Sequence, residues 1–79
     1  MVDRACQVQV LLRDRFADAR TVDIAPNKAW TEVSFRIATR ALAIETQTGK
    51  SMSAIRSHPK VFAAGGGRVI ETGGSVLGA

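Results

Sequence analysis

The chain has 79 residues, which is enough for one small domain and too few for two separate cores. Its composition, 46% hydrophobic and 23% charged, is ordinary for a globular protein and argues against a disordered chain. The only cysteine, Cys6, excludes an intramolecular disulfide framework and a multi-cysteine zinc site. The net charge of +4 arises entirely from residues 36–79, because residues 1–35 balance five basic against five acidic side chains. Such an asymmetry indicates an acidic partner.

The first part of the chain has the pattern of a β-hairpin. Apolar and polar side chains alternate over residues 6–13, which predicts a strand with one buried face. A polar turn over residues 14–18 follows, and a second short alternation over residues 20–25 predicts a partner strand. Pro26 is expected to end this hairpin.

The next segment predicts one long helix over residues 28–48, which contain neither Gly nor Pro. Asn27 is expected to cap its start, and Gly49 is expected to end it in the left-handed conformation. Glu32 and Arg36 are spaced i,i+4 and are expected to pair on the solvent-exposed side. The apolar face of this helix is formed by residues spaced three or four apart, namely Trp30, Val33, Ile37, Ala41 and Ile44.

The last third of the chain predicts a second hairpin. Residues 50–58 fit either a short helix or an extended connection. Residues 60–63 and 68–72 are apolar enough for two strands and flank the three glycines at 65–67, while residues 73–79 are expected to form a loose tail. The prediction is a single α+β domain, with a four-stranded antiparallel sheet in the order β-β-α-β-β and one long helix packed on one face.

The sequence contains no recognisable catalytic or metal-binding constellation. Lys50 and Ser51 follow Gly49 as in a phosphate-binding loop, but Ile44 stands where that motif requires its first glycine. His58 is the only histidine, and no cysteine or carboxylate lies at a ligand spacing from it. The sequence therefore predicts no enzyme activity, no cofactor and no metal ion.

The glycine run is followed by an arginine, which makes the segment Gly65, Gly66, Gly67 and Arg68 a candidate contact loop. Backbone amides in glycine-rich turns can bind anions, and an adjacent guanidinium group would strengthen such a site. A flexible hairpin tip gives the same pattern and is the interpretation that the sequence favours.

Two basic residues share the polar flank of the predicted helix and three follow just past its end, and together these five could form one basic strip. Its members are Arg36, Arg40, Lys50, Arg56 and Lys60. Such a strip suits contacts with phosphate groups or with an acidic protein surface, and an ordinary solvated face gives the same pattern. Few aromatic side chains accompany it, which weakens the case for base stacking.

In its length and layout, the chain resembles the anti-CRISPR proteins, which are small inhibitors encoded by phages and mobile elements. The resemblance implies a non-enzymatic module that binds an acidic protein surface or a nucleoprotein complex and blocks it sterically. It assigns no role to an individual residue.

Two other functions stay open at this level, a small basic regulator that binds nucleic acid directly and a subunit of a larger assembly. The chain is expected to be a monomer or a homodimer. It contains no apolar run long enough for a signal peptide or a membrane span, so a cytoplasmic location is expected.

Overall fold

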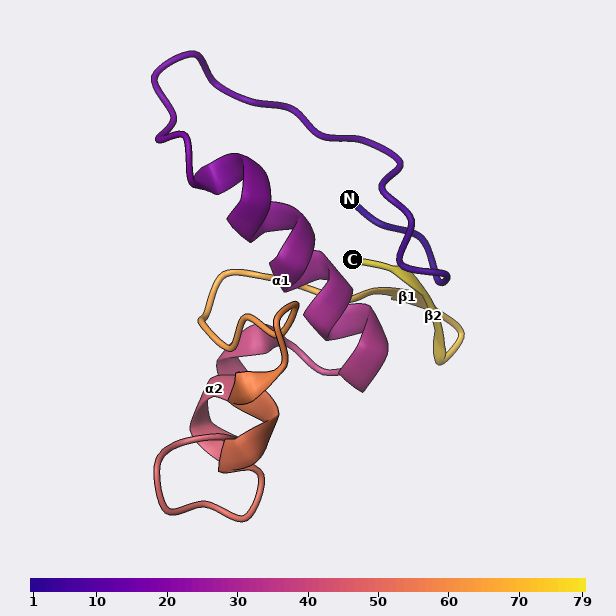
Figure 1. Cartoon of the computed structure of the whole chain (residues 1–79). Coiled ribbons are helices and arrows are strands. Elements are labelled where there is room, and N and C mark those ends of the chain that lie inside the picture. The colour runs from indigo at the N-terminus through magenta and orange to yellow at the C-terminus, as the bar shows by residue number, and fades with distance from the viewer.

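Two helices and a two-stranded antiparallel sheet form the regular structure of the chain (Figure 1). The computed structural model describes all residues, 1–79. Its elements in chain order are α1 (Thr21–Phe35), α2 (Thr39–Glu45), the short 3-10 helix η1 (Ser53–Ser57), β1 (Ile70–Thr72) and β2 (Ser75–Gly78). The α+β class is thus confirmed, whereas the four-stranded sheet and the single long helix are wrong. Neither helix has the length and apolar character needed to cross a bilayer.

Helix α1 begins seven residues before the helix that the sequence predicts, so residues 20–25 do not form a strand. The turn before it is organised by Asp18, whose carbonyl accepts a hydrogen bond from the Thr21 hydroxyl at 2.6 Å. The carboxylate of Asp18 accepts hydrogen bonds from the side chain and the backbone N–H of Arg20, and both lower the pKa of Asp18. Pro26 lies inside α1, where it has no N–H to donate to the carbonyl four residues earlier, and the helix nevertheless continues to Phe35.

The predicted long helix is interrupted at Arg36, which takes a left-handed conformation with φ 59°. Its N–H donates to the carbonyl of Glu32 at 2.6 Å and closes α1. Ala38 is then extended, and α2 starts at Thr39. The left-handed position at the end of a helix is usually occupied by glycine, but here it is occupied by Arg36, so the sequence does not show the break.

Replacing Arg36 with glycine is expected to raise the free energy of unfolding by about 0.5–1 kcal/mol, because glycine takes a positive φ without steric penalty. Urea unfolding followed by the fluorescence of Trp30 would measure the change. The matched control is Arg40→Gly inside α2, which is expected to lower stability by about 1 kcal/mol. A loss of stability in the Arg36 variant would contradict the prediction.

The hairpin of the structure lies at the C-terminus, where β1 and β2 are joined by Gly73 and Gly74. Both glycines have a positive φ, 54° and 81°, as the favoured two-residue hairpin turn requires. Residues 75–78, expected to be loose, therefore form β2. The three glycines at 65–67 lie in a loop before β1 and do not join two strands.

The N-terminus completes this small sheet through backbone pairing. Val2 donates its N–H to the carbonyl of Ala79 at 2.7 Å and accepts from the Ala79 N–H at 3.1 Å. Isolated bridges join Val2 to Val8 and Asp3 to Gly78. The two chain ends consequently lie side by side (Figure 1).

The segment between the sheet and α1 is an extended arm, defined here as residues 7–16, and the strand predicted there is not formed. Its side chains are largely exposed, with Leu12 90% and Phe16 84% accessible to solvent. The buried hydrophobic core is correspondingly small and consists of Val2, Ala29, Val33 and Leu42. The molecule is flat, with extents of 38 × 34 × 17 Å.

Candidate functional site

The loop that carries the three glycines is fixed against both helices. The Nζ of Lys28 in α1 donates to the carbonyl of Gly65 at 2.7 Å. The N–H of Gly67 donates to the hydroxyl of Thr39, the first residue of α2, at 3.0 Å. These two hydrogen bonds hold the loop at both ends, so it is not the free hairpin tip that the sequence favours.

Glu32 lies beneath this loop and is almost completely buried, with 1% of the residue exposed. Its Oε1 accepts the backbone N–H of Thr39 at 3.1 Å, and its Oε2 has no hydrogen-bond partner. The backbone of Gly67 packs directly on this carboxylate. The predicted surface pair between Glu32 and Arg36 is therefore wrong, because Glu32 is buried and the only ion pair in the chain joins Arg20 to Asp18.

The segment before the glycine loop is anchored on α1 by Thr31, a fully buried residue. Its hydroxyl accepts the N–H of Phe62 at 2.9 Å and donates to the carbonyl of Asn27 at 2.7 Å. Nearby, the ring of His58 stacks on Trp30 with centroids 5.2 Å apart. The strand expected at residues 60–63 is thus replaced by a loop that runs back over the helix, and of the strand expected at residues 68–72 only 70–72 form, as β1.

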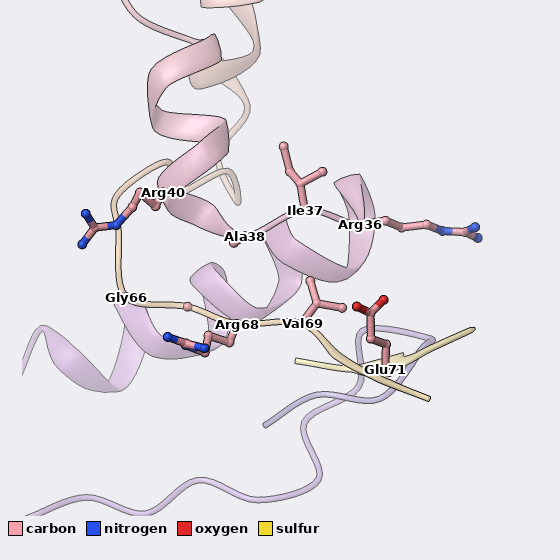
Figure 2. A pocket seen from close by; sticks show the side chains of 9 residues that line it. Arg36, Ile37, Ala38, Arg40, Gly66, Arg68, Val69 and Glu71 are labelled. Carbon is pink, nitrogen blue, oxygen red and sulfur yellow. The ribbon is translucent and has the colours of Figure 1, made fainter. Parts of the chain in front are cut away.

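A pocket of about 450 Å³ opens between this loop, the break between α1 and α2, and the start of β1 (Figure 2). Three arginines, Arg36, Arg40 and Arg68, line it together with one acidic residue, Glu71. The rest of its lining is small or apolar and comprises Ile37, Ala38, Gly66, Gly67 and Val69. The lining therefore carries an excess of positive charge.

The side chains around the pocket form two groups. Figure 2 shows the side chains of Arg40 and Arg68 pointing to the left of the view, Arg40 above Gly66 and Arg68 below it. Arg36 extends in the opposite direction, at the end of the pocket where Glu71 lies. None of the three arginines forms an ion pair within the chain. This arrangement leaves the positive charge beside Gly66 free to bind an anion.

The predicted basic strip is not continuous in the structure. Only Arg36 and Arg40 line the pocket, where Arg68 joins them. Arg56 turns inward, and its guanidinium group donates to the Thr46 hydroxyl and to the Ala43 carbonyl, each at 2.7 Å, linking η1 to α2. Lys60 lies over the ring of Trp30, with Nζ 5.8 Å from its centroid, and Lys50 ends the turn that follows α2.

The sequence did not point to Lys28, Glu32 or Thr39 as residues that position the site. Lys28 and Glu32 are one helical turn apart, which places them on one face of α1, but nothing in their spacing shows that the loop packs on that face. No feature of the sequence indicated that Glu71 would line the pocket.

Comparisons with known proteins identify the family. The model of the HbpS-like family, whose description reads "Haem degrading protein HbpS-like", matches residues 1–79. The corrinoid adenosyltransferase PduO of Citrobacter freundii is 38% identical over 68 residues, covering 81% of this chain and 20% of that protein.

Two solved structures superpose on nearly the whole chain. The Klebsiella pneumoniae protein ORFY has a TM-score of 0.92 and 26% identity, and the match covers 98% of this chain and 55% of that one. The PduOC:heme complex has a TM-score of 0.89 and 30% identity, covering 98% of this chain and 57% of the other. The chain thus spans about half the length of these solved relatives, and a fifth of the curated one.

These matches overturn the resemblance to anti-CRISPR proteins and the inhibitor function that it implied, along with the two alternatives left open beside it. That resemblance depended on length and element layout, which unrelated small domains share. The family match and the superpositions instead cover essentially every residue. The chain belongs to the HbpS-like family.

Proposed function

We propose that this chain is a haem-binding domain. The observation that carries the proposal is its superposition, over 98% of its length and at 30% identity, on PduOC, a protein crystallised with haem. The description of the matching family, which names haem, supports the same ligand. Because the chain spans only part of its relatives, the proposal concerns binding by this domain and not the activity of a whole relative.

The residues of the arginine-lined pocket fit one end of a haem molecule. Its two propionate groups are carboxylates, and guanidinium groups bind carboxylates through paired, charge-assisted hydrogen bonds. Arg36, Arg40 and Arg68 provide three such groups with no competing ion pair. The pocket lining contains no His, Cys or Met, so it offers no side chain of the usual types for the iron.

The histidine and the cysteine of the chain, both of the usual iron-ligand types, lie outside this pocket and make contacts of their own. Nδ1 of His58 accepts the N–H of Lys60 at 3.1 Å, so the hydrogen-bond network assigns the proton of the neutral ring to Nε2. Coordination by either nitrogen would require loss of that hydrogen bond or movement of that proton. Cys6 is half-buried, with its Sγ 3.7 Å from the Ser34 hydroxyl. No iron chemistry is therefore assigned to this chain.

A haem titration tests the proposal. Addition of ferric haem to the protein is expected to shift the Soret band relative to free haem and to saturate at one haem per chain. His58→Ala and Cys6→Ser, measured beside the wild type, report whether either side chain reaches the iron, since removal of a ligand changes the position of the band. A wild-type protein that is folded by circular dichroism and leaves the Soret band unshifted would refute the proposal.

Degradation of haem is a second candidate function, and the description of the matching family favours it. It predicts that the loaded protein, given a reductant and oxygen, loses its Soret band and releases iron faster than free haem does, with catalase present to remove peroxide. The expectation from the sequence is that the chain is not an enzyme, which corresponds to the opposite result, persistence of the band. The two outcomes separate a binding domain from an enzyme.

A further inference from the structure

We propose that the pocket beside Gly66 is a binding site for an oxyanion group, a carboxylate or a phosphate, carried by a small molecule. Its ligands are the guanidinium groups of Arg40 and Arg68 and the backbone N–H of Gly66. Where the oxyanion is a propionate of haem, the proposal rests on the proposed function; where it is a phosphate, the site stands without haem binding.

The two arginines are placed to act together. They come from different parts of the chain, Arg40 from α2 and Arg68 from the segment before β1, and Figure 2 shows both side chains pointing to the same side of the view, above and below Gly66. The side chain of Arg40 lies against Gly65, where a Cβ would be 3.7 Å from its Nε, an ordinary packing distance. Arg40 is exposed, so its guanidinium group remains open to a ligand.

The backbone at Gly66 adds a donor that no protein group uses. Gly66 has φ +122° and is exposed, and its N–H makes no hydrogen bond within the chain. Exposed amides in glycine-rich turns form concave anion sites of this kind. Lys28 adds further charge, since a Cβ on Gly66 would lie only 3.1 Å from its Nζ. A side chain at this position would therefore crowd the ammonium group that holds the loop.

The charge and the size of the pocket narrow the class of ligand. Glu71 lies at the Arg36 end, so an anion is favoured at the opposite end, between Arg40 and Arg68. The volume of about 450 Å³ falls in the range of small-molecule sites and exceeds what a single phosphate or carboxylate group fills. The ligand is therefore an organic molecule or a pyrophosphate that presents such a group. Propionates of haem and free phosphate compounds share this chemistry.

The experiment uses two probes on one set of variants. The first arm compares binding of haem with binding of its dimethyl ester, which keeps the ring and lacks the carboxylates. The second arm titrates pyrophosphate by calorimetry at low salt. The test variant is Arg40→Gln/Arg68→Gln, and the matched control is Arg13→Gln/Arg15→Gln, which changes the net charge equally on the exposed arm.

The double substitution in the pocket is expected to weaken binding of the oxyanion probe by roughly tenfold or more, while the control variant binds like the wild type. A third variant, Arg40→Lys/Arg68→Lys, keeps the charge and loses the paired guanidinium donors, so an intermediate affinity is expected. Circular dichroism of each variant confirms that the fold is retained.

Each outcome decides the proposal. If the pocket variant binds haem more weakly than the wild type does but binds the dimethyl ester equally well, the site is supported and a propionate is identified as its ligand. A loss of pyrophosphate binding supports the site and identifies a phosphate, even if haem does not bind at all. Equal behaviour of the pocket variant and the control variant toward both probes overturns it, and so does a wild-type protein that binds neither probe.

Discussion

Replacing Gly78 with alanine is expected to lower the free energy of unfolding by about 3 kcal/mol, the largest effect of any substitution considered for this chain. A Cβ at this position would overlap the carbonyl oxygen of Val2. That carbonyl also accepts the N–H of Ala79, so it cannot move away without loss of the pairing that joins the two chain ends. Val2 belongs to the small core, which would open with it.

Urea unfolding followed by circular dichroism would measure this effect. The matched control is Gly74→Ala, in the turn of the same hairpin, where φ is +81° and no atom lies within 4 Å of the added Cβ. The control is expected to lose only about 1 kcal/mol, from the unfavourable φ alone. An equal decrease in the free energy of unfolding in the two variants would show that the added Cβ at residue 78 does not displace the Val2 carbonyl.

Replacing Gly67 with alanine is expected to lower the free energy of unfolding by about 2 kcal/mol. The added Cβ would overlap the carboxylate of Glu32, which packing and its hydrogen bond to the Thr39 N–H hold in place. Either the loop must move away, with loss of the hydrogen bond from the Gly67 N–H to the Thr39 hydroxyl, or the Glu32 carboxylate must move, with loss of its hydrogen bond from the Thr39 N–H. The substitution is also expected to lower the affinity for any ligand that binds beside Gly66.

A double-mutant cycle isolates this contact. The Glu32→Ala variant removes the carboxylate, so the effect of Gly67→Ala is expected to fall below about 1 kcal/mol in that background, a coupling of at least 1 kcal/mol. Gly65→Ala is the control within the same loop, since its Cβ would make only ordinary contacts with Arg40. Additive effects of the Glu32 and Gly67 substitutions would contradict the proposed packing.

The α+β class could be predicted from the sequence because alternating and helical patterns both occur, but the boundaries could not. Residues 20–25 alternate over so few positions that the same side chains suit the first turns of a helix. What decides between them is the turn at Asp18, whose contacts with Arg20 and Thr21 organise the start of α1. A proline usually ends or kinks a helix, so the sequence predicts a boundary at Pro26, whereas α1 runs through it.

The end of α1 lay beyond prediction for a different reason. A positive φ at a non-glycine residue leaves no compositional signal, so Arg36 looked like one more helical residue. The opposite error occurred at the hairpin. Gly73 and Gly74 form a two-residue turn of the favoured kind between β1 and β2, but the longer glycine run at 65–67 is the stronger turn signal in the sequence and is where the sequence predicts the hairpin.

The sequence predicts the residue types of the candidate site but not that they come together. Arg36 and Arg40 were assigned to one basic set and Arg68 to the glycine loop, and the structure brings all three to one pocket. The long-range contacts that join them, from Lys28 to Gly65 and from Gly67 to Thr39, link positions 37 and 28 residues apart. Local spacing carries no information about contacts of that range.

The pairing of Val2 with Ala79 has a consequence for the order of folding events. These two hydrogen bonds close a loop that includes almost the entire chain, so they carry the largest loss of chain entropy of any contact in the fold. Helix α1 and the hairpin at Gly73 and Gly74 close only short loops and form from local interactions. We therefore expect the pairing of Val2 with Ala79 to form late, with the small core around Val2 completed only at that step.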